Sequence, residues 1–214
     1  MTRTATLILF IGFIVTVGLW RTGASSAQDD ATPPAVASPS PDATSGFVFP
    51  EVGQVPDGLV VISDGERTLD DVASGFSDPV ATIELFVAWG WRGNDIRAFH
   101  VADDISAEPT AIDGVYISVH EFGSPQFAAE ALDYSLEEHL NDPALDEVAR
   151  PGFGDHARTL FGEMAYGNEI TFYVQRGSLV IRLSASSPEG DPTVEATQLM
   201  EALLDAQPAT PVAT

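Results

Sequence analysis

The stretch Ile170–Ser184, with the sequence ITFYVQRGSLVIRLS, decides the fold of this chain. Apolar and polar residues alternate on both sides of Arg176-Gly177, which is the period-2 pattern of strands with one buried face. Because glycine supplies the positive φ that a tight turn needs, the stretch predicts a β-hairpin with Arg176-Gly177 at its tip. We expect Gln175 to lie opposite Ser178. That register pairs the inward residues as Val174–Leu179, Phe172–Ile181 and Ile170–Leu183, and the outward residues as Thr171–Arg182 and Tyr173–Val180.

Three helices are predicted around the hairpin, because a capping side chain precedes a proline at three places. They begin near Pro79, Pro125 and Pro192, and each is expected to bury one apolar stripe: Val80, Ile83, Phe86 and Val87; Ala128, Ala131, Leu132 and Leu136; Ala196, Leu199, Met200, Leu203 and Leu204. Two further strands are expected at residues 96–101 and 115–122. Together these elements predict a single α+β domain, an antiparallel sheet with amphipathic helices packed on one face. The other face is then open to solvent or to a partner.

Both ends of the chain differ in composition from this domain, which is expected over residues 47–206. Residues 1–27 combine Arg3, an apolar run at 4–20 and the small residues Ser25-Ser26-Ala27, which is typical of an export signal. Cleavage after Ala27 and retention of the run as a membrane anchor both stay open, because the run has 17 residues and a span needs about 20. Residues 28–46 and 207–214 are rich in Pro, Ala, Ser and Thr and predict a disordered linker and tail. We therefore expect a secreted or extracytoplasmic protein that meets a membrane only through residues 4–20, if these are not cleaved.

Composition excludes several classes of partner and chemistry. The chain has no cysteine, so it has no disulfides, no thiolate nucleophile and no lipid-anchor cysteine. All nine basic residues are arginines, and 32 acidic residues bring the formal net charge to −23. Nucleic acid and anionic lipid repel such a chain, so neither is expected as a partner. The four histidines lack the spacing of zinc ligands, and we expect no metal site and no cofactor.

A weak family resemblance covers residues 112–205. A strand is followed by a Ser-Pro helix start, a Gly-Asp segment at 151–157, a hairpin with Arg-Gly at its tip and a final helix. This order resembles exported actinobacterial-type domains, namely the extracellular sensor domain of membrane serine/threonine kinases and related cell-envelope lipoproteins. The resemblance implies an α+β fold and a ligand-binding or sensing role. It transfers no site residues, because this chain lacks the cysteines of those families.

The candidate ligand-binding residues come from the face of the sheet opposite the predicted helices. If the apolar residues at 115, 117 and 119 face the helices, one polar patch forms on the other side: Tyr116, His120, Tyr173 and Arg182. These groups can stack on rings and hold an anion or a hydroxyl. Trp91-Arg92, in a glycine-flanked loop, is a second candidate because recognition surfaces favour aromatic and arginine side chains. The alternatives are a mixed face that meets only water and a Trp91 that fills the core.

These observations favour a non-enzymatic exported domain that binds a small molecule, a glycan or an envelope protein. An extracellular hydrolase with an unrecognised site is the alternative. It requires His120 or His156 close to a carboxylate and a hydroxyl. A purely structural envelope protein is the third interpretation.

Overall fold

The computed structural model describes residues 46–102, 112–149 and 152–207, which form a seven-stranded antiparallel sheet with four α-helices. The predicted export signal, almost all of the linker and the tail beyond Gln207 lie outside these residues. None of the described helices has the length and hydropathy to cross a membrane. The α+β class and the antiparallel sheet predicted from the sequence are confirmed.

The strands follow the order β1-β2-β3-β7-β6-β5-β4 across the sheet. Their bounds are β1 (Leu59–Arg67), β2 (Gly93–Val101), β3 (Gly114–Glu121), β4 (Leu145–Glu147), β5 (His156–Met164), β6 (Gly167–Arg176) and β7 (Leu179–Ser187). The helices are α1 (Leu69–Ala73), α2 (Pro79–Ala88), α3 (Pro125–His139) and α4 (Thr193–Asp205), with a 3₁₀ turn at Val52–Gln54. Side chains of Asp78 and Ser124 cap α2 and α3 as expected.

The central hairpin forms, but its predicted register is wrong by two residues. Arg176 pairs with Leu179, so the loop is Gly177-Ser178 and not Arg176-Gly177. Gly177 has a φ of 57°, and its N–H donates to Asp155 Oδ2 at 2.8 Å. The alternation of apolar and polar residues determines which face of the sheet each residue occupies, but a shift of the register by two residues leaves those faces unchanged. The faces were therefore predicted correctly, whereas the cross-strand partners were not. In the observed register Tyr173 lies opposite Arg182.

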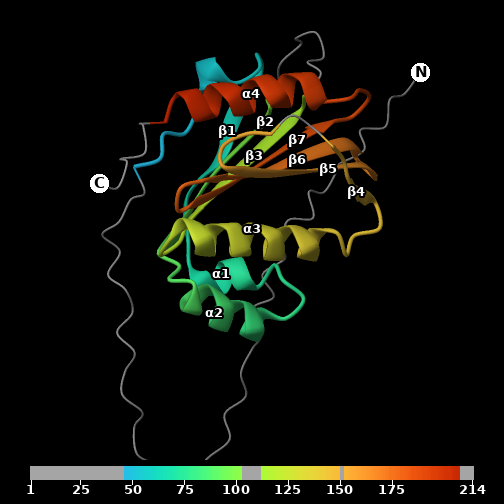
Figure 1. Cartoon of the computed structure of the whole chain (residues 1–214). Coiled ribbons are helices and arrows are strands. Elements are labelled where there is room, and N and C mark those ends of the chain that lie inside the picture. The colour runs from blue at the N-terminus through green and yellow to red at the C-terminus, as the bar shows by residue number, and fades with distance from the viewer. Residues whose placement is uncertain (1–45, 103–111, 150–151, 208–214) are drawn as a thin grey trace, which may run out of the picture. The chain divides into compact units, whose positions relative to one another are not determined.

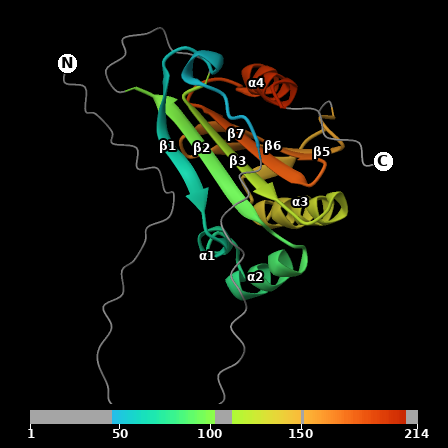
Figure 2. The same cartoon turned by 90° about the vertical axis from the view of Figure 1, so that its left-hand side faces the viewer.

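Helices cover both faces of the sheet, so the expectation that they pack on one face is wrong. In Figures 1 and 2, α4 lies on one side of the sheet and α3 lies on the other, with α1 and α2 beyond it. The α4 side buries the predicted inward residues, among them Ile170, Phe172 and Ile181. The α3 side is apolar as well, because Leu160, Tyr173 and Val180 pack against this helix. Large side chains on both faces of β5–β7 require two helical layers.

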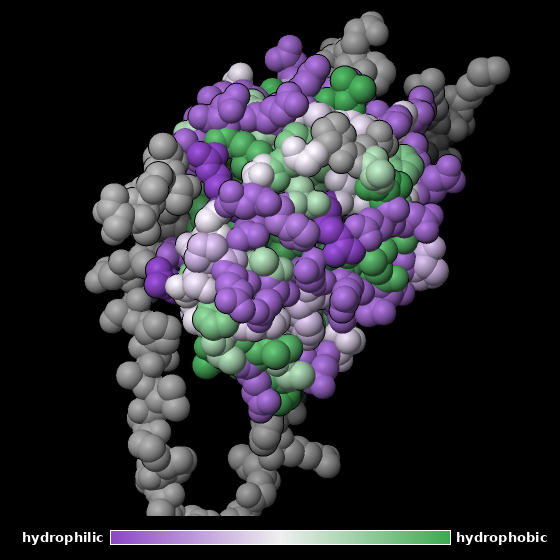
Figure 3. All heavy atoms as spheres, viewed as in Figure 1, coloured by the Kyte–Doolittle hydropathy of each residue, from purple (hydrophilic) through white to green (hydrophobic). Residues whose placement is uncertain are grey.

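The first predicted helix also buries fewer residues than expected. Val80 and Val87 of α2 are 68% and 60% exposed, and only Thr82 and Phe86 are buried. α2 contacts α3, where Thr82 Oγ1 lies 2.8 Å from the hydroxyl of Tyr134, and the ring of Phe86 also reaches His120 of β3. The two buried residues of α2, Thr82 and Phe86, are four positions apart and lie on one side of the helix, which is enough for this packing. Figure 3 shows apolar surface at the end of the molecule where α2 lies in Figure 1.

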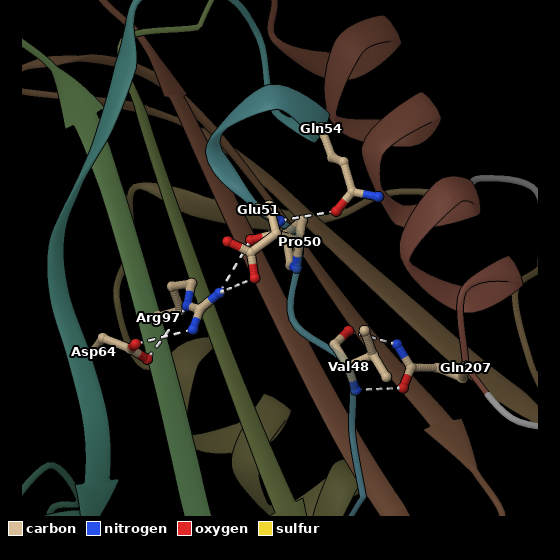
Figure 4. Close-up of polar contacts among 7 residues, drawn as sticks. All are labelled: Val48, Pro50, Glu51, Gln54, Asp64, Arg97 and Gln207. Carbon is tan, nitrogen blue, oxygen red and sulfur yellow. Dashed lines mark hydrogen bonds and ion pairs between the residues drawn. The ribbon is translucent and has the colours of Figure 1, made fainter.

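Residues 46–54, which we call the N-terminal strap, cross the α4 side of the sheet and are held at two places (Figure 4). Gln207 donates from Nε2 to the Val48 carbonyl and accepts from the Val48 N–H, both at 2.8 Å. Arg97 of β2 donates to the Pro50 carbonyl at 3.2 Å and pairs with Asp64 at 2.9 Å. The strap is therefore part of the folded domain.

Candidate functional site

Arg182, in the middle of β7, is the centre of the candidate site. Its side chain projects from the α3 side of the sheet and is half-buried. Strands β3 and β6 flank β7, and each contributes a tyrosine ring to the guanidinium. Its Cζ lies 5.5 Å from the ring centroid of Tyr116 and 6.0 Å from that of Tyr173. Both distances are those of cation–π contacts.

A directional chain of hydrogen bonds connects Arg182 to Glu169. Arg182 Nε donates to Ser184 Oγ at 3.1 Å, and Ser184 Oγ lies 2.7 Å from Thr171 Oγ1. Thr171 donates its proton to Glu169 Oε1 at 3.0 Å, so it must accept from Ser184. The other carboxylate oxygen of Glu169 accepts from the Tyr166 hydroxyl. Two hydroxyl groups thus separate the positive and the negative charge.

The terminal nitrogens of Arg182 have no acceptor among the described residues. No carboxylate there lies within ion-pair distance of this guanidinium. In the described part of the chain, Asn94 Oδ1 is the one fully buried side-chain polar atom that lacks a hydrogen-bond partner. The two Nη atoms of Arg182 also lack a partner but are not in this class, so both retain contact with solvent. Burial alone would lower the pKa of Arg182, but Tyr173, Glu169 and Tyr116 outweigh it and raise the pKa. Arg182 is therefore a permanent positive charge whose terminal nitrogens are not completely buried.

Tyr173 connects this site to the end of α3. Its hydroxyl bonds to His139 Nδ1, which also lies 3.0 Å from the carbonyl oxygen of Ser135. Burial, followed by the charge of Arg182, lowers the pKa of His139 to about 4. Burial raises the pKa of Tyr173 to about 12. Both groups are neutral at physiological pH, so Arg182 is the charged group of this cluster.

His120 lies on the same face of the sheet but belongs to a separate polar chain. Trp91 Nε1–H donates to His120 Nδ1 at 3.3 Å, which places the imidazole proton on Nε2, 3.4 Å from Ser118 Oγ. Asn94 Nδ2 also donates to Ser118 Oγ, at 2.7 Å. The hydroxyl proton of Ser118 is then left without an acceptor in the described part of the chain. Burial, followed by the charges of Arg67 and Arg182, lowers the pKa of His120 to about 3.

The structure brings together three of the six predicted site residues: Tyr116, Tyr173 and Arg182. His120 contacts Trp91 instead, and Trp91 packs against the apolar cluster on the α3 side, as its core interpretation predicts. Arg92 forms an ion pair with Glu121 at 2.8 Å on the surface.

The alternation placed Ser118, Thr171 and Ser184 on the same face as Arg182, but the hydrogen bonds and pairings that connect them to it were not predicted. Ser184 and Thr171 face each other across β6 and β7, and Ser118 faces Arg182 across β3 and β7. These pairs follow from the true register, whereas the predicted register placed Thr171 opposite Arg182. The position of Gly177 in the loop could have indicated the true register, because the register depends on whether this glycine is the first or the second residue of the turn.

A polar hollow lies beside the tip of the hairpin, away from Arg182. It has a volume of about 730 Å³ and is lined by residues 152–155, Arg176 of the hairpin and the end of α4. Gly154 has a φ of 58°, and a Cβ there would lie 2.3 Å from the carbonyl oxygen of Gln175. The glycine is required by this close approach of β6.

No family model and no curated protein matches this chain. Among solved structures, the chain is similar to the extracellular domain of PknH from Mycobacterium tuberculosis. The identity is 10%, the TM-score is 0.39, and the match covers 69% of this chain and 82% of that chain. A similarity of this size says nothing about ligands.

Proposed function

We propose that this protein is a non-enzymatic, extracytoplasmic binding domain that takes an anionic ligand at Arg182. The observation that supports it is the free Nη edge of a half-buried guanidinium. Six arginines lie among the described residues, and the other five donate from a terminal nitrogen to a protein oxygen: Arg67, Arg92, Arg97, Arg158 and Arg176. In a chain of net charge −23, an arginine without a carboxylate is available to an external anion.

Donors outnumber acceptors at this site, which favours an acceptor-only ligand. Ser118 lies opposite Arg182 in the register of β3 and β7, so their Cβ atoms are about 5 Å apart. Its hydroxyl proton and the two Nη groups all lack an acceptor in the described part of the chain. An anion that accepts from these groups satisfies all of them.

The hydrolase alternative receives less support from the geometry. Ser118 and His120 form a hydroxyl–imidazole pair, but Trp91 fixes the tautomer that donates to the serine and cannot take its proton. His156 lies 3.4 Å from Asp133, and no hydroxyl group is among its partners in the described residues. Neither pair has the arrangement of a nucleophile beside a base.

Titration with acetate and sulfate, followed by NMR at constant ionic strength, tests the proposal. We expect saturable shifts of the amide signals of Ser118, Arg182 and Ser184. Arg182→Gln should abolish them, whereas Arg92→Gln, a matched change at a surface ion pair, should not. If neither acetate nor sulfate gives saturable shifts, or if both variants lose the shifts equally, the proposal is overturned.

A further inference from the structure

We infer that the anion recognised by Arg182 is a carboxylate that enters edge-on between Tyr116 and Tyr173. This inference rests on the proposed function, because it specifies the ligand of the same site. It follows from which edge of the guanidinium is free, from what lies on its two sides and from the local charge.

The free edge of Arg182 accepts two oxygens of one anion. The Nε side is already occupied, since Nε donates to Ser184 at 3.1 Å. The Nη1 and Nη2 groups then present two parallel N–H bonds in the plane of the guanidinium, which is the fork that a carboxylate accepts. The hydroxyl of Ser118, which lies opposite Arg182 on the neighbouring strand β3, can donate a further hydrogen bond to one of these oxygens.

The tyrosine rings select the shape of the anion. They lie 5.5 Å and 6.0 Å from Cζ, on the strands at either side of β7. The face of an aromatic ring carries negative charge density and repels anionic oxygens. A carboxylate has no oxygen outside the plane of the fork. A tetrahedral anion places its two remaining substituents above and below that plane, toward the rings; both are oxygens in sulfate, and one is an oxygen in methanesulfonate.

The charge of the site favours a monoanion. Arg182 is the one cation of the cluster, and Glu169 already lies two hydroxyl groups away. A single negative charge balances the guanidinium, whereas a dianion adds an uncompensated charge to a chain of net charge −23.

Competition among small anions tests this inference on the unaltered protein. Acetate and methanesulfonate both carry one negative charge and differ in shape, and sulfate adds a second charge. We expect acetate to saturate the Arg182 signals at a concentration at least about tenfold lower than either of the others. If methanesulfonate or sulfate binds as well as acetate, the carboxylate inference fails and the anion site stands. If none of the three saturates, both proposals fail.

Variants separate shape selection from simple attraction. Tyr116→Leu removes one ring and should reduce the preference for acetate over methanesulfonate to within about threefold. Ser118→Ala should weaken acetate binding several-fold. Ser74→Ala, an exposed hydroxyl that donates to the Asp71 carbonyl, is the matched control and should leave it unchanged. An unchanged preference in a folded Tyr116→Leu protein contradicts the role of the ring.

The source of the carboxylate is distinguished by two probes. Glucuronate presents it on a sugar ring, and a short peptide with a free carboxyl terminus presents it on an extended chain. Tighter binding of one probe than of acetate identifies the source, and the matching amide of that probe should lose all binding. Retention of binding by the amide contradicts the inference.

Discussion

At the residue scale, Tyr173 has two roles. Its ring flanks Arg182, and its side chain, 2% exposed, fills the core beneath α3. The hydroxyl bonds to His139, which attaches the helix to the sheet. The alternation predicted Tyr173 on an outward face that meets solvent, but α3 covers that face at Tyr173.

Truncation of Tyr173 should therefore destabilise the domain strongly. We expect Tyr173→Ala to lower the free energy of unfolding by about 3–5 kcal/mol, since a large buried ring leaves a cavity. Tyr166→Ala is the control, because Tyr166 is 36% exposed, and it should cost about 1 kcal/mol or less. Urea melts of both variants measure the difference. Equal losses contradict the burial of Tyr173.

Two half-buried histidines predict the acid sensitivity of the fold. The pKa values of His139 and His120 are lowered to about 4 and about 3 from an ordinary value near 6.5. Between pH 6.5 and 4 the unfolded chain thus binds more protons than the folded one, so stability is complete above pH 6.5 and falls as pH decreases. Each histidine contributes up to about 1.4 kcal/mol per pH unit.

Urea melts at pH 7 and pH 5 measure this slope. Asp71 and Glu147, whose pKa values are lowered from 3.8 and 4.5, are ionised in the folded protein throughout that window. His139→Gln should make the dependence on pH less steep. An unchanged slope in this variant means that His139 does not carry the effect.

At the element scale, α2 shows how an apolar helix can pack with one narrow stripe. Val80→Ser and Val87→Ser should each change the free energy of unfolding by about 0.5 kcal/mol or less, because both side chains lie in water. Phe86→Ala should cost about 3–5 kcal/mol, because Phe86 is 1% exposed and contacts Phe76, Phe122 and Tyr134. Thermal melts of the three variants test this order, and a costly Val80 change contradicts it.

The elements that could be predicted from the sequence are those with a local signature. Capping side chains at Asp78 and Ser124 marked the starts of α2 and α3, and strict alternation marked the hairpin. The sequence did not reveal β1 and β5, where the burial pattern does not alternate, or the second helical layer. The number of helical layers depends on which face of the sheet each helix packs against. A periodic sequence pattern shows only that one face of an element is buried, and not what covers it.

The candidate site could be predicted only in part. The parity of the strands placed Tyr116, Tyr173 and Arg182 on one face, and this was correct. The separation of His120 from them could not be derived, because it depends on the indole of Trp91, which comes from a loop. The hydroxyl chain through Ser184 required the exact register.

At the scale of the whole molecule, charge sets the response to salt. A net charge of −23 repels itself in the compact state, and screening should relieve this repulsion. Raising NaCl from 20 to 300 mM at pH 7 should raise the melting temperature, by about 2–4 °C for each kcal/mol gained. Near pH 4.1, the isoelectric point, the same step should have no stabilising effect. Equal responses at both pH values contradict a charge effect.

The bonds between Gln207 and Val48 join positions that are 159 residues apart in the chain. Topologically, the domain is close to a ring that has been opened at one point. A peptide of a few residues could close that ring, and new ends could be cut in a surface turn while the order of the strands in the sheet stays the same. Because Val48 and Gln207 are bonded to each other, the chain enters and leaves the domain at neighbouring points on its surface. Tension between them would then fall first on the hydrogen bonds between Gln207 and Val48, and next on the contacts of Arg97 and Arg176 that hold both ends to the sheet.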